Sequence, residues 1–174
     1  KIAIVTASTR GIGLACTQRL AREGATVYMA ARNMERAENR AKELNDEGCN
    51  VKTVYNDATE KETYTSMVEE VCKNEGRIDI LVNNFGTSNP QKDLDIKNTE
   101  YDEFIRTVDI NLASVFMTSQ AVIPHMAANG GGSIINISSI GGLRPDISQI
   151  AYGTSKAAIN YLTKIIATQC ARDN

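Results

Sequence analysis

Short apolar runs alternate with longer segments of helical pattern along the whole chain. The first run, Ile-Ala-Ile-Val at 2–5, is apolar at every position, as is typical of a strand covered on both faces. The pattern predicts strands at 1–6, 25–30, 51–55, 78–82 and 133–137, and helices at 14–23, 33–47, 60–75, 100–123 and 150–172. This alternation favours a doubly wound parallel α/β sheet with right-handed crossovers, in a single domain over residues 1–174.

The last predicted helix has no strand after it. Its apolar stripe is nevertheless that of a helix packed on a sheet, and comprises Ile159, Leu162, Ile165 and Ile166. We therefore expect the sequence to stop within a larger domain, before a sixth strand.

Composition and charge exclude several classes of protein. Hydrophobic residues make up 42% of the chain and the net charge is −2, which does not favour nucleic acid or an anionic membrane surface as a partner. No apolar run approaches the ~20 residues of a membrane-spanning helix. Four scattered cysteines predict reduced thiols in a cytoplasmic protein, and one histidine, His125, is too few for a histidine-based triad or zinc site, so no metal is expected.

A glycine-containing turn joins the first strand to the first helix. Residues 6–13 read Thr-Ala-Ser-Thr-Arg-Gly-Ile-Gly, and a helix N-terminus after such a turn presents unpaired backbone N–H groups to an anion. Gly11 would let the backbone approach a pyrophosphate, and Gly13 would permit close helix–strand packing. A structural turn is the alternative, but its place after the first strand of a βαβ unit favours a dinucleotide.

The residues after the second strand predict which dinucleotide binds. An acidic residue there would bind the ribose 2′-hydroxyl of NAD. This chain has Arg32 instead, and Arg10 lies in the phosphate loop. Guanidinium groups pair with a 2′-phosphate, so NADP(H) is favoured over NAD(H); two solvated surface arginines are the alternative.

Polar residues that follow the third and fourth strands are further candidates. Asp57 is equally suited to bind an adenine amino group or to cap a helix beginning near Thr59. Gly86 would allow close approach of a cofactor and Asn83 would tie neighbouring strands, unless 83–86 is a plain turn. Asn111 lies among apolar residues of a helix, where a satisfied structural amide is favoured over one that holds a water for Lys156.

Tyr152 and Lys156 lie four residues apart on a predicted helix, so their side chains share one face. An ammonium near a phenol stabilises the phenolate and lowers the phenol pKa from ~10. Ser139 ends a strand-like run and would hydrogen-bond the same substrate oxygen. This set predicts a general acid/base acting on an alcohol or carbonyl, although Y-x-x-x-K alone also occurs at the edge of ordinary amphipathic helices.

Together these residues resemble the short-chain dehydrogenase/reductase family, which has a Rossmann-type fold. Its cofactor loop T-G-x-x-x-G-x-G matches 6–13 except at Ala7, and its N-N-A-G segment matches 83–86 except at Phe85. We expect these two departures to alter the loop and the nicotinamide pocket. Its catalytic residues fall on Asn111, Ser139, Tyr152 and Lys156.

The resemblance implies reversible hydride transfer between NADP(H) and a secondary alcohol or ketone. Asn111 would support a water-linked proton path to Lys156, and the molecule would form a homodimer or homotetramer through its last two long helices. The implied cofactor contacts are Thr6, Ser8, Thr9, Arg10, Gly11, Ile12, Gly13, Arg32, Asp57, Ala58, Asn84, Phe85, Gly86, Tyr152 and Lys156.

Several stretches are similar to bacterial 7α-hydroxysteroid dehydrogenases, clostridial ones in particular. They lie at 64–69, 75–87 and 145–152, and they imply a bile acid as substrate. The alternatives are a reductase of another small carbonyl compound, an NADP-binding regulator without turnover, and an inactive partial chain that lacks the lid over the substrate and the last strands.

Overall fold

Five parallel strands form one sheet, as the alternating pattern predicts, and the structure gives their order as β3-β2-β1-β4-β5. The structure is a computed structural model that describes residues 1–173, so Asn174, the last residue of the predicted domain, lies outside it. The strands are β1 (Ile2–Thr6), β2 (Thr26–Ala31), β3 (Asn50–Tyr55), β4 (Ile80–Asn83) and β5 (Ser133–Asn136). The helices are α1 (Gly11–Arg22), α2 (Met34–Asp46), α3 (Glu62–Glu75), α4 (Tyr101–Ala128), the short 3₁₀ turn η1 (Ile140–Gly142) and α5 (Ile150–Gln169).

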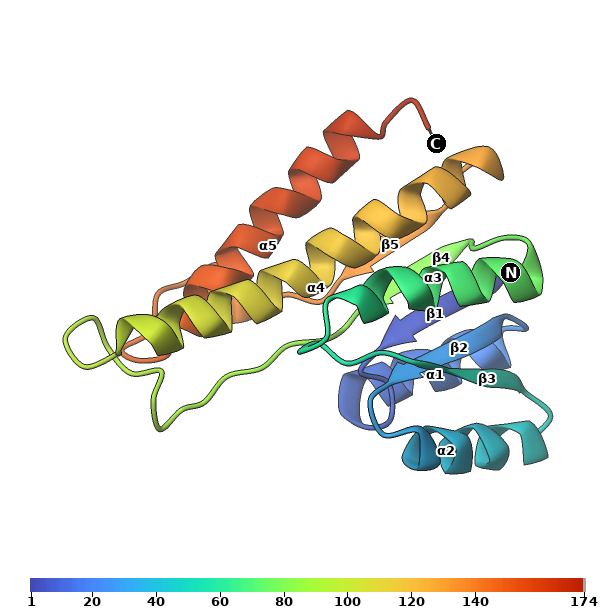
Figure 1. Cartoon of the computed structure of the whole chain (residues 1–174), viewed down its shortest axis with the longest axis horizontal. Coiled ribbons are helices and arrows are strands. Elements are labelled where there is room, and N and C mark those ends of the chain that lie inside the picture. Colours follow the sequence, from blue (N-terminus) through green and yellow to red (C-terminus); the bar gives the residue numbers. More distant parts are fainter. Residues whose placement is uncertain (174) are drawn as a thin grey trace.

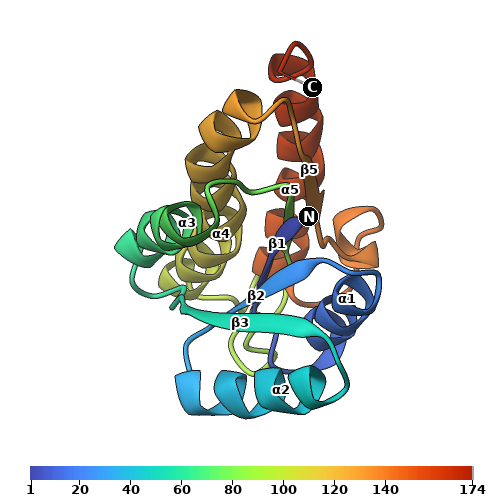
Figure 2. The ribbon, with the colours of Figure 1, turned by 90° about the vertical axis from the view of Figure 1, so that its right-hand side faces the viewer.

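Alternate residues of the strands enter two separate cores. Ile2 and Ile4 of β1 face α3 and α4, whereas Ala3 and Val5 face α1 and α2. Figure 2 shows the sheet between these two helical layers, and Figure 1 shows α5 running beside α4. Because successive side chains of a strand point to opposite faces, a strand that is apolar throughout is buried on both sides.

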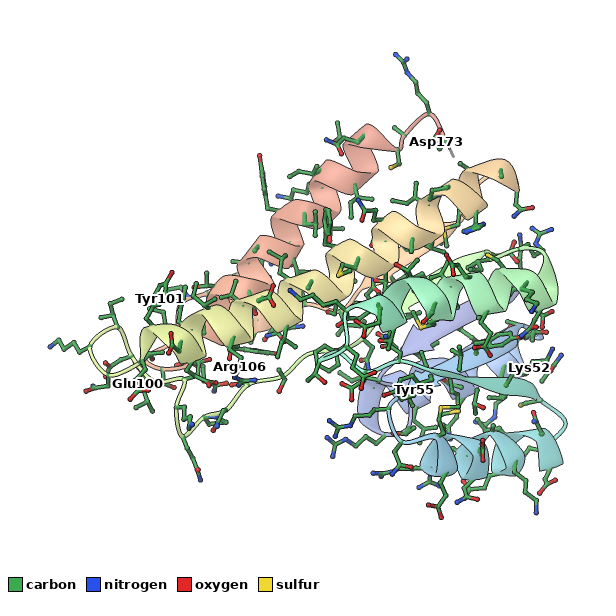
Figure 3. The ribbon with its side chains drawn as sticks, viewed as in Figure 1. Lys52, Tyr55, Glu100, Tyr101, Arg106 and Asp173 are labelled. Carbon is green, nitrogen blue, oxygen red and sulfur yellow. The ribbon has the colours of Figure 1, made fainter. Side chains whose placement is uncertain are left out.

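The sheet and the start of the long helix α4 lie towards opposite ends of the molecule. Figure 3 shows Lys52 of β3 towards one end of the molecule and Tyr101, the first residue of α4, towards the other, with Tyr55 nearer the middle. Over residues 1–173, no helix combines the length and apolar character needed to cross a membrane.

Several helix boundaries differ from the prediction: α1 begins at Gly11, before the end of the glycine turn, and α5 ends at Gln169 instead of near 172. The expected end at 123 is wrong because α4 continues through Pro124 to Ala128, and Met126 in this last stretch is buried against Val122 and the sheet. Helix α3 begins at Glu62, later than the predicted start near 60. The predicted cap of α2 is confirmed, since Asn33 Oδ1 accepts the backbone N–H of Arg36 at 2.8 Å.

In the turn between β1 and α1, an alanine adopts the left-handed backbone conformation that glycine usually occupies. Ala7 has φ +50° and Gly11 has φ +54°. The left-handed region brings Cβ close to the following carbonyl oxygen, so this conformation costs Ala7 energy that it does not cost Gly11. Packing of the turn therefore holds Ala7 in a strained conformation.

A buried carboxylate joins the starts of β1 and β4. Asp79 Oδ2 accepts the backbone N–H of Ile2 at 2.7 Å, and Arg77 and Lys1 pair with the same carboxylate. Burial alone would raise the pKa of Asp79, but the hydrogen bonds from Arg77, Ile2 and Lys1 outweigh it and hold the pKa below its usual range. Asp79 therefore stabilises the fold in its ionised form.

We expect Asp79→Asn to lower the free energy of unfolding at pH 7 by about 1–3 kcal/mol, the usual range for hydrogen bonds to a charged group. Because the folded-state pKa is depressed, this contribution is complete above the unfolded pKa of ~3.9 and is lost as the pH falls through the folded-state value. Urea unfolding at pH 7 and pH 3 measures the difference. The exposed Asp46→Asn is the control, and equal effects of the two variants would contradict the prediction.

Ala7→Gly is expected to raise the free energy of unfolding by up to about 1 kcal/mol, because glycine relieves the left-handed strain and loses part of that gain to chain entropy. The matched control is Ala113→Gly inside α4, which is expected to lower it by about 1 kcal/mol. Thermal and urea unfolding report both variants. Destabilisation of the same size in both would show that Ala7 is unstrained.

Candidate functional site

The carboxyl ends of all five strands meet at one edge of the sheet. The loops that follow them therefore gather there, and they contain the phosphate loop, Arg32, Asp57, 84–86 and Ser139. β1 lies between β2 and β4, so the loop after β1 and the loop after β4 leave the sheet at the point where the strand order reverses. Open α/β sheets bind ligands at this switch point.

The loops after β1 and β4 are joined by side-chain hydrogen bonds. Thr6 Oγ1 accepts the backbone N–H groups of Asn84 at 2.9 Å and Phe85 at 3.2 Å. Asn84 Nδ2 donates in return to the carbonyl oxygens of Thr6 at 3.1 Å and Ala7 at 3.2 Å. A Cβ at Gly13 would lie 2.5 Å from Asn84 Nδ2, so only glycine lets α1 approach this junction.

The N-terminus of α1 is open to an anion. No side chain caps it, and Arg10, Gly11 and Ile12 are exposed there. Ser8, by contrast, is fully buried and donates to the Ala30 carbonyl oxygen, so its hydroxyl serves the contact between β1 and β2. Uncapped backbone N–H groups at a helix start attract a negatively charged group.

Arg32 follows β2 and is 74% exposed at the side chain. Its Nε lies 3.7 Å from Asp57 Oδ2, while Asp57 Oδ1 accepts the backbone N–H and the hydroxyl of Thr59 at 2.9 and 2.8 Å. The carboxylate of Asp57 therefore holds the turn at Thr59 but caps no helix, because α3 starts three residues later, after Lys61, without a side-chain cap; the expected capping role is wrong. Ala58 is buried next to it.

Lys156 lies buried beside the ring of Tyr152. Its Nζ is 5.6 Å from the ring centroid and donates to the carbonyl oxygen of Ile137 at 2.9 Å. Burial lowers the pKa of Lys156, which is only 2% exposed. A Cβ at Gly86 would lie 3.0 Å from Nζ, so this glycine gives the ammonium room beside the loop after β4.

Ser139 is held against the same helix. Its Oγ accepts the N–H of Gly141 at 3.2 Å, which leaves the hydroxyl hydrogen available to another oxygen. A Cβ at Gly142 would lie 2.7–2.9 Å from backbone atoms of Lys156 and Ala157, so η1 packs directly on the α5 backbone. Ser138 Oγ adds a hydrogen bond to the Lys156 carbonyl oxygen at 3.2 Å.

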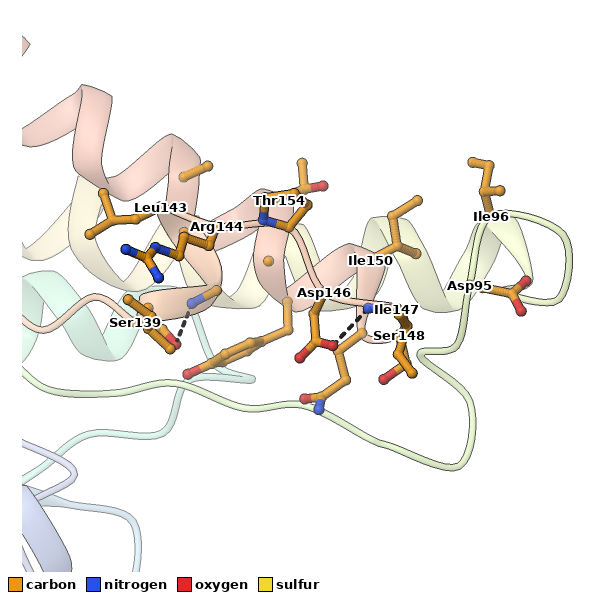
Figure 4. Close-up of a pocket in the computed structure, with 18 of the residues that line it drawn as sticks. Asp95, Ile96, Ser139, Leu143, Arg144, Asp146, Ile147, Ser148, Ile150 and Thr154 are labelled. Atoms are coloured by element: carbon orange, nitrogen blue, oxygen red, sulfur yellow. Dashed lines mark hydrogen bonds between the residues drawn. The ribbon is translucent and has the colours of Figure 1, made fainter.

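A cavity of about 840 Å³ opens over these residues (Figure 4). Ser139 and Tyr152 both line it, with Arg144, Asp95 and Asp146 among its polar walls. Most of its other large side chains are apolar, namely those of Leu94, Ile96, Ile140, Leu143, Ile147 and Ile150, and all of these except Leu94 and Ile150 are largely exposed. A largely apolar cavity with a few polar groups is typical of a small-molecule site.

Two buried asparagines act as ties. Asn83 donates to Asn136 Oδ1 at 2.9 Å and accepts from Thr118 at 2.6 Å, so the predicted tie between strands is confirmed. Asn111 accepts the N–H of Thr87 at 2.8 Å and donates to the Thr87 carbonyl and Ser155 Oγ at 2.9 and 3.0 Å. The amide of Asn111 thus has protein partners, as a structural amide would, and its water-mediated link to Lys156 stays a prediction.

Sequence reasoning missed three residues that hold the site together. Asp93 is fully buried and accepts backbone N–H groups at the start of α5, Ser155 links Asn111 to the Tyr152 carbonyl, and Gly142 seats η1 on α5. Asp93 lies in a polar loop that also contains Asp95, and nothing in the sequence distinguishes a buried, structural aspartate from an exposed one there. Ser155 and Gly142 stand beside Lys156 and Ser139 in the sequence, so proximity to the motif was the available signal.

The residues present fit a nicotinamide dinucleotide. The open N-terminus of α1 suits a pyrophosphate, and the space beside Gly86 borders the ammonium of Lys156. Across the described part of the chain, no three histidine, cysteine, aspartate or glutamate side chains gather as metal ligands would.

Comparisons with known proteins agree with this geometry. The chain is 54% identical over 174 residues to a 7alpha-hydroxysteroid dehydrogenase of Clostridium sardiniense and 40% identical over 174 residues to one of Bacteroides fragilis, covering 66% and 67% of their lengths. A gluconate 5-dehydrogenase from Burkholderia cenocepacia, solved in complex with NADP and tartrate, is 34% identical with a TM-score of 0.92, and the match covers all of this chain and 67% of that one. Residues 1–174 match the family described as short chain dehydrogenase. The chain therefore belongs to the short-chain dehydrogenase/reductase family.

Proposed function

We propose that this chain carries the cofactor site and catalytic residues of an NADP(H)-dependent oxidoreductase that interconverts a secondary alcohol and a ketone. One observation carries the proposal: Ser139 and Tyr152 line one cavity, and the buried ammonium of Lys156 lies against the Tyr152 ring. A regulator without turnover has no need of this arrangement. The chain covers 66% and 64% of the lengths of the two most identical relatives compared, so the whole-protein activity is part of the proposal.

Each residue has a separate task in the reaction. Tyr152 gives its proton to the substrate oxygen in reduction and takes it back in oxidation. The ammonium of Lys156 stabilises the negative charge on the phenol oxygen while the proton is away. Ser139 donates a hydrogen bond that holds the substrate oxygen. The bound nicotinamide supplies or accepts the hydride.

NADP(H) is the proposed cofactor because guanidinium groups pair with a phosphate, and two exposed ones lie in neighbouring loops after β1 and β2. Arg32 follows β2 directly and Arg10 lies in the neighbouring loop after β1, both exposed. No carboxylate occupies positions 31–33, which read Ala-Arg-Asn. The gluconate 5-dehydrogenase that this chain resembles was itself solved with NADP, which supports the same cofactor here.

The proposed substrate is a bile acid with a 7α-hydroxyl group. The two relatives with the highest identities among those compared are 7alpha-hydroxysteroid dehydrogenases, at 54% and 49%. The cavity beside Tyr152 has a predominantly apolar wall, in which Ile147 is 91% exposed. A steroid ring system buries such a wall, whereas a polyol such as gluconate does not.

We also propose a homodimer or homotetramer in a cytoplasmic setting. Ile105 and Phe116 of α4 are 43% and 49% exposed, which leaves apolar surface on a long helix that runs beside α5. All four cysteines are free thiols, which suits a reducing compartment.

Tyr152→Phe is expected to lower kcat by about 10²–10⁴-fold, because the acid/base group is removed, while NADPH binding stays within about threefold. Tyr161→Phe is the matched control, since Tyr161 lies on the same helix and is 67% exposed. Absorbance of NADPH follows turnover with a 7α-hydroxylated bile acid, its 7β epimer and gluconate. Full turnover in Tyr152→Phe would refute the catalytic assignment, and turnover of gluconate alone would refute the substrate.

Arg32→Asp is expected to lower the NADP/NAD ratio of kcat/KM by about 10–100-fold. The change removes a charge-assisted hydrogen bond to the 2′-phosphate and adds a carboxylate suited to a ribose hydroxyl. Initial rates with each cofactor give the ratio. The same charge change at exposed Arg172, far along the chain, is the control, and an unchanged ratio in Arg32→Asp would count against NADP(H) recognition by this residue.

A further inference from the structure

The start of α5 is held by one dipeptide of a distant loop. The loop between β4 and α4 brings Asp93 and Leu94 against residues 149–152, nearly 60 positions later in the chain. The backbone N–H groups of Gln149 and Ile150 donate to the carbonyl oxygens of Asp93 and Leu94 at 3.1 and 3.2 Å. A helix leaves its first four N–H groups without intrahelical partners, so these contacts satisfy groups that would otherwise be unpaired.

Both carboxylate oxygens of Asp93 complete the contact. Oδ1 accepts the N–H of Ala151 at 2.8 Å and Oδ2 accepts the N–H of Tyr152 at 2.9 Å. Asp93 is 0% exposed, so these hydrogen bonds are shielded from water. A carboxylate at a helix N-terminus also complements the helix dipole.

The carbonyl of Tyr152 is held by a second route to the same loop. It accepts the hydroxyl of Ser155 at 2.7 Å, and Ser155 Oγ accepts from Asn111, which is paired with both backbone groups of Thr87. The backbone of Tyr152 is therefore fixed at its N–H by Asp93 and at its carbonyl by Ser155. Both paths end in the segment 87–93, which directly follows the cofactor-side residues 84–86.

The helix start is also locally strained. Gln149 has φ +58°, in the left-handed region, and its side chain accepts the hydroxyl of Ser88 at 3.0 Å. A non-glycine residue persists in this region only where its surroundings over-determine it. The contacts of Asp93, Leu94 and Ser88 supply that constraint.

We propose that Asp93 is a positioning residue, which sets the place of Tyr152 relative to the loop that borders the nicotinamide by holding the N–H groups of Ala151 and Tyr152. The inference rests on the proposed function, in which Tyr152 is the proton donor and acceptor. Displacement of a reacting group by about 1 Å costs roughly 10²-fold in rate, so a loosened helix start lowers kcat more than cofactor affinity.

The test compares Asp93→Ala, Asp93→Asn and the exposed Asp102→Asn on α4 as the charge-matched control. Amide hydrogen exchange is measured at Ala151 and Tyr152, NADPH affinity by fluorescence, and kcat and KM with a 7α-hydroxylated bile acid. In Asp93→Ala we expect at least tenfold faster exchange at both amides and a kcat about 10–100-fold lower, with NADPH affinity within threefold. Asp93→Asn keeps one acceptor oxygen and is expected to fall between Asp93→Ala and the parent protein, while Asp102→Asn matches the parent.

A double variant separates positioning from general loss of structure. If Asp93 acts through Tyr152, then Asp93→Ala lowers turnover no further in a Tyr152→Phe background. Unchanged exchange, an unchanged kcat, or parallel loss of kcat and NADPH binding in the two Asp93 variants would each overturn the proposal. If Asp93→Ala does not fold, Asp93→Asn gives the same readouts.

The two proposals fail in distinguishable ways. Full turnover in Tyr152→Phe alone overturns the catalytic role of Tyr152, and with it the positioning role of Asp93. Loss of turnover in Tyr152→Phe with parent-like kcat in the Asp93 variants overturns only the positioning role.

Discussion

The parallel alignment of the strands is the constraint on which the site depends. Because every strand ends at the same edge, segments separated by more than a hundred residues meet there. The sheet alone brings them together, so no separate long-range contact is needed for each pair. The hydrogen bonds of Thr6 and Asn84 then join the loops on either side of the reversal in strand order. Alternate side chains of β1 are packed in the two cores on either side of the sheet. Close packing on both faces fixes this central strand, and with it the position of the loop at its carboxyl end.

Helix α5 converts that edge into a candidate reaction site. Tyr152 and Lys156 share one of its faces, and the buried ammonium of Lys156 donates a hydrogen bond to the carbonyl oxygen of Ile137, the residue after β5. The hydrogen bond to this carbonyl keeps the ammonium in position, because burying an ammonium without a partner costs several kcal/mol of free energy. Gly142 lets the segment with Ser139 lie directly on the helix, so Ser139 and Tyr152, which come from two segments, line one cavity, and Lys156 is buried beside the Tyr152 ring.

Much of this could be predicted from the sequence, and the omissions have a common cause. The parallel, doubly wound sheet follows from the βαβ alternation, whereas the order of its strands does not; the phosphate loop, Asn83 and the Tyr152–Lys156 pair follow from local spacing. Asp93 could not be found this way because its partners lie almost 60 residues away and its own neighbours resemble any polar loop. The end of α4 was missed because burial of Met126 outweighs the helix-breaking tendency of Pro124.

The sequence by itself determined the periodicities, and through them the fold class, the family motifs and the residue types that the chemistry requires. Hydrophobic period and turn residues are local properties, so they can be read along the chain. Only the tertiary structure decided which oxygen each buried N–H group meets. The side-chain amide of Asn111 donates to the Thr87 carbonyl and to Ser155 Oγ, and Asp93 accepts the N–H groups at the start of α5. Those pairings depend on the distance between side chains in space, which sequence separation does not encode.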